Sequence, residues 1–327
     1  PKLRLGQVHE RAGRNGEALR CYQLAAIVAP QEPEPLLHQV FSLVAMERHT
    51  EARAVAASLG RLNGTANAPA LAAIAAGVVA SADGNAAGAV THFRAAVRKS
   101  GEHGTYALCL LADQLTDLGR FDEASEAYSR ALLLESGNLR AHMGLGYLNY
   151  RRGDLSAAGD RFKTAYERAK DQGERNAAEP AYFRGVVAEE RGRLRVALKH
   201  YRAAVEHDPE ALDFRLALAG LYERMEQSDR ALRIYLDVSR LDSSDALCVL
   251  QAALILSERK TGARRALELV EEAVRRDAKL HDAYLVGGSI CQDVLSQPKA
   301  AIRWYERYLA AGGRDRRVRE WLRELRR

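Results

Sequence analysis

The side chains that could perform catalysis or bind a metal are scattered along this 327-residue sequence. His200 and His207 are seven residues apart and could share a helix face, but the histidine pair four residues apart that binds zinc on a helix does not occur. The adjacent acids Glu189 and Glu190 would point about 100° apart on a helix, so they would not converge as a catalytic pair. We therefore expect no enzyme activity and no metal site.

The glycines and cysteines also show no pattern typical of a cofactor or metal site. The stretch Gly144 to Asn149 (GLGYLN) matches a dinucleotide-binding loop only superficially, because no strand precedes it, and the phosphate-binding pattern GxxxxGK[ST] is absent. Cys21, Cys109, Cys248 and Cys291 lie far apart without a CxxC pair. This spacing argues against a zinc cluster and a disulfide framework. We expect buried, reduced thiols and no cofactor.

The net charge of the chain is concentrated at one end. The formal charge is +6, and residues 314–327, with seven arginines and three acids, contribute +4 of it. The rest of the chain is nearly neutral, whereas phosphate binding requires a sustained basic face. No stretch reaches the roughly 18 uninterrupted apolar residues that a membrane span requires. We expect no nucleic-acid partner and no direct membrane insertion.

The composition also bears on the source and the compartment. The chain has 8 lysines against 41 arginines and is rich in alanine, which suggests a genome rich in G and C, and we expect a bacterial source. Cysteines without a pairing pattern favour the cytoplasm. A periplasmic location, or tethering to a membrane through an absent upstream segment, is the alternative.

An internal repeat organises the sequence and must position any binding residues. Nine times, an alanine, here called the lead alanine, is followed four residues later by an aromatic or apolar residue and usually, three residues after that, by another alanine. The nine lead alanines are Ala18, Ala52, Ala89, Ala124, Ala158, Ala197, Ala231, Ala266 and Ala301. They are 34, 37, 35, 34, 39, 34, 35 and 35 residues apart. Such a regular period indicates a repeat architecture.

Each period has the pattern of two helices joined by a tight turn. A second small residue precedes the lead alanine by twelve positions in most copies, for example Gly146 before Ala158 and Ser289 before Ala301. In five copies a glycine five residues before the lead alanine marks the turn, where a helix end needs the left-handed conformation. These turn glycines are Gly13, Gly84, Gly119, Gly153 and Gly192.

The small residues predict how the two helices of a period pack. Helices approach closely only where neither carries a large side chain, and the aromatic residue after the lead alanine would fill the space beside the crossing. One hairpin cannot bury its apolar faces alone, so nine hairpins stacked in sequence would share a continuous core. We therefore expect an all-α solenoid and not a compact bundle.

The stretch Ala107 to Pro209 resembles the tetratricopeptide repeat, whose 34-residue helix-turn-helix unit carries this pattern of small and aromatic residues. Leu145-Gly146 through Ala158, Phe162 and Ala165 match it well, although no copy has the consensus tryptophan in its first helix. The resemblance covers roughly residues 1–313. It implies a right-handed superhelical α-solenoid of about nine repeats, the first truncated at its start, with first helices lining a concave groove.

Residues at positions two, five, nine, twelve and thirteen of each repeat would face this groove. We expect the following residues to bind a partner there: Tyr106, Asp113, Arg140, Met143, Tyr147, Tyr150, Arg151, Tyr182 and Glu189. Tyrosine, methionine and arginine are enriched at the centres of protein interfaces. The alternative is that Tyr147 and Tyr182 pack between adjacent repeats.

Two further groove features follow from the same positions. Toward both ends the groove positions become apolar, at Ile74, Val78, Leu250, Leu254, Val286 and Ile290, where a partner segment could dock or neighbouring repeats could simply pack. Family members that clamp the acidic C-termini of chaperones use lysine or arginine and asparagine after the small position. This chain has no asparagine there, so a chaperone adaptor of that type is disfavoured.

Residues 314–327 predict one more helix after the array. Val318, Trp321 and Leu322 share a face, which fits a helix that caps the open end of a solenoid. The alternative is a basic patch for an acidic partner, formed by Arg316, Arg317, Arg319 and Arg323.

The sequence thus favours a non-enzymatic scaffold that binds a protein or peptide in its concave groove within a multi-protein assembly. One alternative is an autoinhibited module of a larger polypeptide, whose groove is filled by another part of the same chain. The other is an electrostatic adaptor that acts through the arginine-rich terminal helix.

Overall fold

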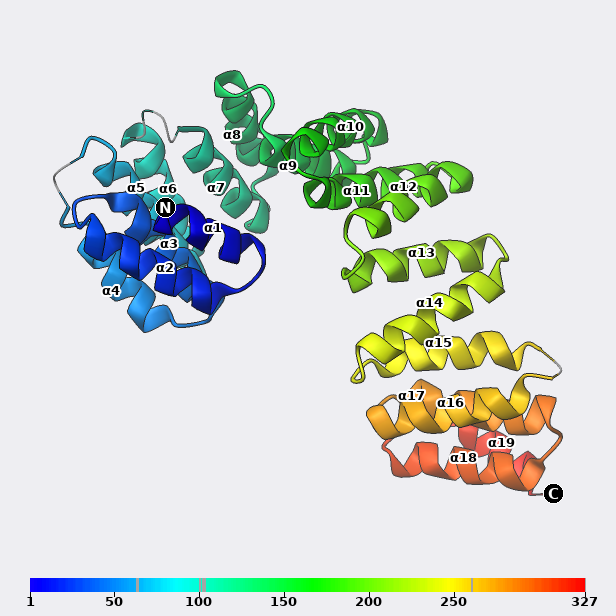
Figure 1. The fold of residues 1–327 in the computed structure, drawn as a ribbon. Helices are drawn as coiled ribbons and strands as arrows, with labels where there is room; N and C mark the ends of the chain where they lie inside the picture. The colour runs from blue at the N-terminus through cyan, green and yellow to red at the C-terminus, as the bar shows by residue number, and fades with distance from the viewer. Residues whose placement is uncertain (63–64, 100, 102–103, 260, 327) are drawn as a thin grey trace. The chain divides into compact units, whose positions relative to one another are not determined.

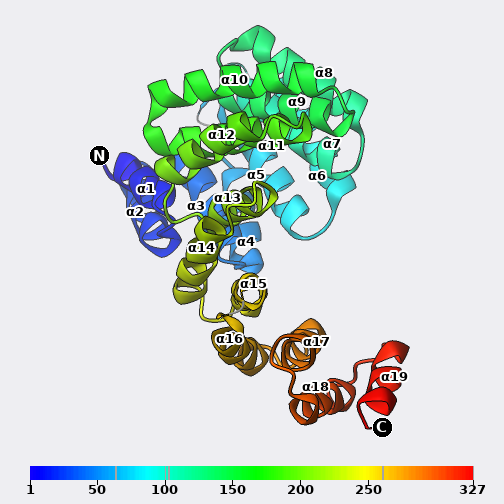
Figure 2. The same ribbon diagram turned by 90° about the vertical axis from the view of Figure 1, so that its right-hand side faces the viewer.

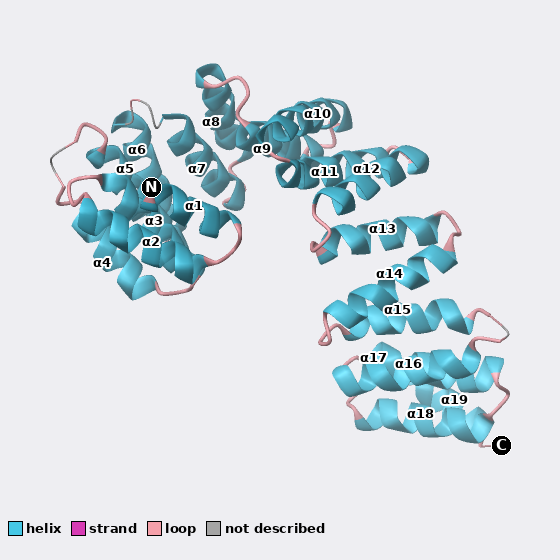
Figure 3. Ribbon diagram, in the orientation of Figure 1, coloured by secondary structure: helices cyan, strands magenta, loops and turns pink. Residues whose placement is uncertain are grey.

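The computed structural model of the chain describes residues 1–62, 65–99, 101, 104–259 and 261–326. Within these residues the backbone forms helices joined by turns and loops and contains no strand (Figure 3). The chain divides into two compact units, Pro1–Pro180 and Ala181–Arg327. None of the helices in the described part combines the length and the apolar content needed to cross a membrane.

The helices that begin in the first unit are shown in blue to green in Figure 1. They are α1 (Lys2–Arg11), α2 (Asn15–Val28), α3 (Pro33–Ala45), α4 (His49–Leu59), α5 (Ala68–Ala82), α6 (Ala86–Lys99), α7 (Gly104–Asp117), α8 (Phe121–Leu134), α9 (Leu139–Arg151), α10 (Leu155–Gln172), the 3-10 helix η1 (Glu174–Ala177) and α11 (Ala178–Glu190).

The remaining helices of the second unit run from green to red. They are α12 (Leu194–His207), α13 (Leu212–Arg224), α14 (Ser228–Leu241), α15 (Ala246–Ser257), α16 (Ala263–Arg276), α17 (His281–Ser289), the π-helix η2 (Ile290–Val294), α18 (Pro298–Ala310) and α19 (Arg316–Leu325). Figure 2 shows α15 to α18 as two successive hairpins, with α19 beside α18.

The predicted hairpins are confirmed within the described residues. Each odd-numbered helix from α1 to α17 is followed by an even-numbered partner that carries the lead alanine. All nine lead alanines have 0% exposed surface. Because these side chains are small and fully buried, the two helices of a hairpin can approach closely at the alanine positions.

Glycine at the second small position allows the partner's aromatic ring to lie against the backbone. A Cβ atom added to Gly146 would lie 2.5 Å from the ring of Phe162, and one added to Gly185 would lie 2.4 Å from the ring of Tyr201. Real Cβ atoms do not approach so closely, so a larger residue would force the helices apart. Phe162 and Tyr201 are buried as a result, with 0% and 2% exposed surface.

The turn inside each hairpin uses the left-handed backbone conformation that the sequence predicts. The five turn glycines have φ between 69° and 79°. Three other hairpins place Glu47, Glu226 and Ser296 at the same position, five residues before the lead alanine, with φ of 58°, 57° and 53°. These residues take a conformation that costs a non-glycine residue free energy.

The last hairpin corrects one prediction. The helix contact in this hairpin is made by Gly288 and not by Ser289, which is exposed. An added Cβ on Gly288 would lie 2.2 Å from the ring of Tyr305. The π-helix η2 inserts one extra residue between this glycine and the lead alanine, and this shifts the register by one position.

The cysteine prediction holds for three of the four thiols. Cys109, Cys248 and Cys291 are buried, whereas Cys21 on α2 is only half-buried. Burial raises the pKa of the Cys109 thiol and of the Cys248 thiol to about 12. Both therefore remain protonated and poorly nucleophilic at neutral pH.

Helix α19 follows the ninth hairpin. Asp315 precedes it and accepts a hydrogen bond from the Arg317 amide at 2.9 Å, as an N-terminal cap does. Val318 and Leu322 are buried, and the Trp321 ring lies 5.4 Å from the ring of Tyr305 on α18. The apolar face of α19 thus covers part of the last hairpin.

Candidate functional site

The predicted partner-binding residues lie on the first helices of three hairpins. Tyr106 and Asp113 are on α7, and the residues from Arg140 to Arg151 are on α9, all within the first unit. Tyr182 and Glu189 are on α11, in the part of that helix that belongs to the second unit.

Two of the predicted binding acids are engaged by tyrosines of their own hairpins. The Tyr128 hydroxyl donates a hydrogen bond to Asp113, and the Tyr201 hydroxyl donates one to Glu189 at 2.6 Å. Tyr235 donates to Glu223 in the same way, at 2.7 Å. Burial, aided by the neighbouring carboxylate, raises the pKa of the Tyr128 and Tyr235 hydroxyls. These bonds fasten the second helix of a hairpin to its first.

The same acids contact a base on the following first helix. Arg140 forms an ion pair with Asp113, and Arg224 forms one with Glu189 at 2.5 Å. In this arrangement one carboxylate links two helices of its own hairpin to the next hairpin. Asp113, Arg140 and Glu189 therefore have structural partners, although each side chain is still partly exposed.

The Tyr106 side chain packs against a neighbouring helix and also reaches the surface. Its side chain is 37% exposed, and its ring lies edge-on to the ring of Phe41 on α3, with the ring centres 6.2 Å apart. Burial raises the pKa of its hydroxyl. The Phe41 contact joins α3 to α7 within the first unit. Sequence analysis did not select Phe41 as a binding residue.

Helix α9 carries a partly exposed group of four predicted residues. Met143, Tyr147 and Tyr150 lie at i, i+4 and i+7, on one face of the helix, and all three are half-buried. The Arg151 guanidinium lies 5.9 Å from the Tyr147 ring centre and 5.7 Å from that of Phe121. Its Nη1 donates a long hydrogen bond of 3.4 Å to the Tyr147 hydroxyl. This face, called the α9 face, consists of Met143, Tyr147, Tyr150 and Arg151.

Tyr182 lies in a cluster of aromatic rings within the second unit. Its ring stacks on Phe214 of α13 at 5.2 Å and lies 5.6 Å from Tyr201 of α12. Burial raises the pKa of the Tyr182 hydroxyl. Tyr182 therefore contributes to packing between hairpins, while its side chain remains half-exposed. Phe214, which sequence analysis did not single out, is part of this cluster.

The apolar groove positions toward the two ends fall into two groups. Ile74, Leu250 and Ile290 are core residues with at most 4% exposed surface. The other three, Val78, Leu254 and Val286, are half-buried.

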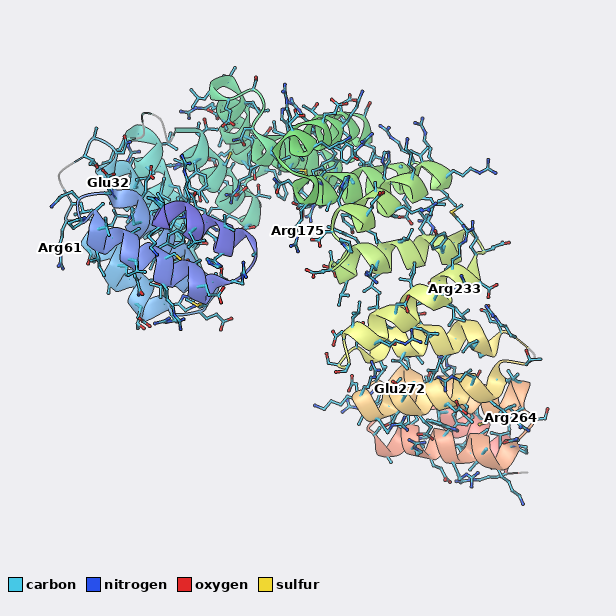
Figure 4. All side chains as sticks on the ribbon, in the orientation of Figure 1. Glu32, Arg61, Arg175, Arg233, Arg264 and Glu272 are labelled. Carbon is cyan, nitrogen blue, oxygen red and sulfur yellow. The ribbon has the colours of Figure 1, made fainter. Side chains whose placement is uncertain are left out.

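The basic residues of the terminal helix are all at the surface. Arg316, Arg317, Arg319 and Arg323 are exposed, and Arg317 is paired with Asp315 at 2.6 Å. Exposed arginines also occur on other helices, such as Arg233 on α14 and Arg264 on α16 (Figure 4). Among the described residues, no group of three or more histidine, cysteine or acidic side chains is placed to hold a metal ion.

The geometry defines a class of protein, a chain of stacked helical hairpins with small-residue crossings and a period of 34 to 39 residues. Family models described as tetratricopeptide repeat match residues 109–174 and residues 188–254. The chain thus contains tetratricopeptide repeats in these two stretches. No curated protein sequence matches it.

Two solved structures are similar to this chain in fold. A tetratricopeptide repeat protein from Parabacteroides merdae ATCC 43184 is 17% identical, with a TM-score of 0.51, over 79% of this chain and 99% of that chain. A chain of the APC/C hetero-tetramer Cut9-Hcn1 is 16% identical, with a TM-score of 0.60, over 84% of this chain and 52% of that one. This chain thus spans about half the length of the latter.

Proposed function

We propose that this chain is a non-enzymatic scaffold that binds a peptide or a segment of a protein through the first helices of its repeats. Tetratricopeptide repeats generally serve as protein-interaction scaffolds, and two such stretches are present. The protonated, buried thiols of Cys109 and Cys248 offer no nucleophile at neutral pH. The proposed mechanism is shape and anchoring, without covalent chemistry.

The observation that carries this proposal is the α9 face. Met143, Tyr147 and Tyr150 expose aromatic and thioether surface along one side of a rigid helix, next to the Arg151 guanidinium. Rigid side chains with an apolar body and a polar tip lose little entropy on binding, and this favours them as anchors in an interface. Asp113 and Arg140 would then serve mainly to hold the neighbouring helices in place.

The test starts from peptides selected on the purified full chain from a displayed random library. Alanine at both Tyr147 and Tyr150 should weaken binding of a selected peptide at least about tenfold, the effect expected for interface anchors. The matched control is Lys163→Ala on α10, because Lys163 is exposed on the second helix of the same hairpin. Equal binding by the parent and the double variant would overturn the proposal.

Tyr182 is tested separately, since its ring contacts Tyr201 and Phe214. If Tyr182 also anchors the partner, Tyr182→Ala alone should weaken binding of the selected peptide and keep the helical circular dichroism signal of the parent. Loss of helical signal would instead assign Tyr182 to the core.

A further inference from the structure

A cavity of about 380 Å³ lies at the end of the second unit, where η2, α18 and α19 meet α17. Leu285 and Val286 supply apolar surface, and Tyr305 and Trp321 supply two aromatic rings. Asp293 is the single charged side chain among the described residues that line it. The cavity therefore combines aromatic and apolar walls with one carboxylate.

In the last hairpin Asp293 has the sequence spacing of the acids that fasten other hairpins, but Gln292 takes their structural place. Glu189 and Glu223 each precede the tyrosine that donates to them by twelve residues. Asp293 precedes Tyr305 by the same twelve residues. In this last hairpin, however, the Tyr305 hydroxyl donates to Gln292 at 3.2 Å. Because the π-helix η2 shifts the register by one residue, Gln292 lies four residues after the crossing glycine Gly288, as Glu189 lies four residues after Gly185. Asp293, one residue further on, does not receive this tyrosine hydrogen bond.

Asp293 also lacks a base such as the one that pairs with Glu189. Glu189 pairs with Arg224, which lies on the next first helix. After the last hairpin the next helix is α19, and it brings Trp321 to the cavity in place of a base. In the part of the chain that the structure describes, Asp293 is exposed and no basic side chain forms an ion pair with it. The nearby Arg317, whose guanidinium lies 5.9 Å from the Trp321 ring centre, is paired with Asp315.

The Asp293 carboxylate and the Tyr305 ring both line the cavity. Burial raises the pKa of the Tyr305 hydroxyl to about 12, and the negative charge of Asp293 adds to this effect. The carboxylate is thus close enough to the Tyr305 ring to influence it, and a ligand inside the cavity would meet both groups.

We propose that this cavity binds the guanidinium group of an arginine in the partner peptide, an inference that rests on the proposed function. The arginine would pair with Asp293 as Arg224 pairs with Glu189, and its planar group would stack on Trp321. Guanidinium fits such a site better than ammonium, because it is planar, binds carboxylates through two N–H groups and stacks on aromatic rings. The partner would thus supply a base for Asp293, which has no ion pair among the described residues.

The test uses the full chain and two short peptides, acetyl-Gly-Ala-Arg-Ala-Gly-amide and its counterpart with citrulline in place of arginine. Citrulline keeps the shape of the arginine side chain and removes its charge. The chain has two tryptophans, of which Trp304 is buried with 5% exposed surface, so the indole N–H signals in NMR spectra report on Trp321 with Trp304 as an internal reference. We expect the arginine peptide to shift the Trp321 signal and the citrulline peptide to bind at least about tenfold more weakly, since the ionic hydrogen bonds are lost.

Three variants complete the experiment. Asp293→Asn should weaken binding of the arginine peptide at least about tenfold, and Asp293→Glu should retain most of it. The control Asp282→Asn removes an exposed acid from α17 outside the cavity and should leave binding unchanged. An unmoved Trp304 signal shows that a variant remains folded.

Equal shifts from the two peptides, or unchanged binding by a folded Asp293→Asn variant, would overturn the inference. If Asp293→Asn fails to fold, the comparison of arginine with citrulline on the parent chain decides alone. Neither result depends on the α9 face. If the cavity does not bind arginine but the double alanine variant of Tyr147 and Tyr150 still weakens peptide binding, the proposed function stands. If the cavity binds arginine but the double variant binds its peptide as the parent does, only the proposed function is refuted.

Discussion

Replacing Glu226 by glycine should raise the free energy of unfolding by about 0.5 to 1 kcal/mol. Glu226 has φ of 57° at the turn between α13 and α14, where the repeat elsewhere has glycine. A left-handed conformation costs a non-glycine residue roughly 1 to 2 kcal/mol. Glycine avoids this cost but loses about 0.5 to 1 kcal/mol more conformational entropy on folding, so the gain is the difference between the two.

Two comparisons isolate the backbone effect. Glu226→Ala removes the same exposed side chain but keeps a Cβ atom, so it should gain nothing. Gly192→Ala makes the reverse change in the second unit and should lower the free energy of unfolding by about 0.5 to 1 kcal/mol. A Cβ on Gly192 would meet no atom within 4 Å, so steric crowding does not contribute.

The assay is urea unfolding followed by circular dichroism at 222 nm. A shift of the midpoint with an unchanged slope measures stability, because the slope reports the surface exposed on unfolding. If Glu226→Gly were no more stable than Glu226→Ala, the assignment of strain to this turn would be refuted.

Other expected outcomes follow from single contacts. Arg276→Met should lower stability by about 2 kcal/mol, because the Arg276 guanidinium donates to three carbonyls in the last turn of α14 and the loop before α15. Arg275→Met removes an exposed side chain and should change stability by less than about 0.5 kcal/mol, and urea unfolding measures both. Cys109 and Cys248, with thiol pKa values of about 12, should react with Ellman's reagent at pH 8 at least about a hundredfold more slowly in the folded chain than in urea; equal rates would contradict their burial. The pKa of the Tyr305 hydroxyl is about 12 in the folded chain against an ordinary 10, so the folded state is favoured only while this hydroxyl is protonated. The free energy of unfolding should therefore fall as pH rises from 10 to about 12. The fall should be smaller in Tyr305→Phe, as unfolding curves at alkaline pH would show.

The helix crossings could be predicted from the sequence because they require small residues, alanine or glycine. Ala158 and Gly146 are small wherever they are placed, and only close helix contact explains small residues at a fixed period. The same reasoning predicted the left-handed turn at Gly153. It failed at Ser289, because one extra residue in a π-helix leaves the spacing of the lead alanines unchanged and moves the contact to Gly288.

The roles of the charged residues could not be predicted from position alone. Asp113 and Glu189 occupy positions that face a groove in such repeats, and the sequence does not show that a tyrosine hydroxyl from the second helix reaches them. One signal was present, since Glu189 and Glu223 precede their tyrosines by the same twelve residues. The aromatic contact of Tyr182 with Phe214 depends on packing between hairpins, and this distance is not encoded in the period.

The most direct measurement of the central claim places a photo-cross-linking benzoylphenylalanine at position 147, and in a second variant at position 163. Tyr147 lies on the α9 face, and Lys163 is exposed on the second helix of the same hairpin. Irradiation with a library-selected peptide should give a cross-linked adduct from position 147 and none from position 163. An adduct from position 163 alone would contradict binding through the first helices of the repeats.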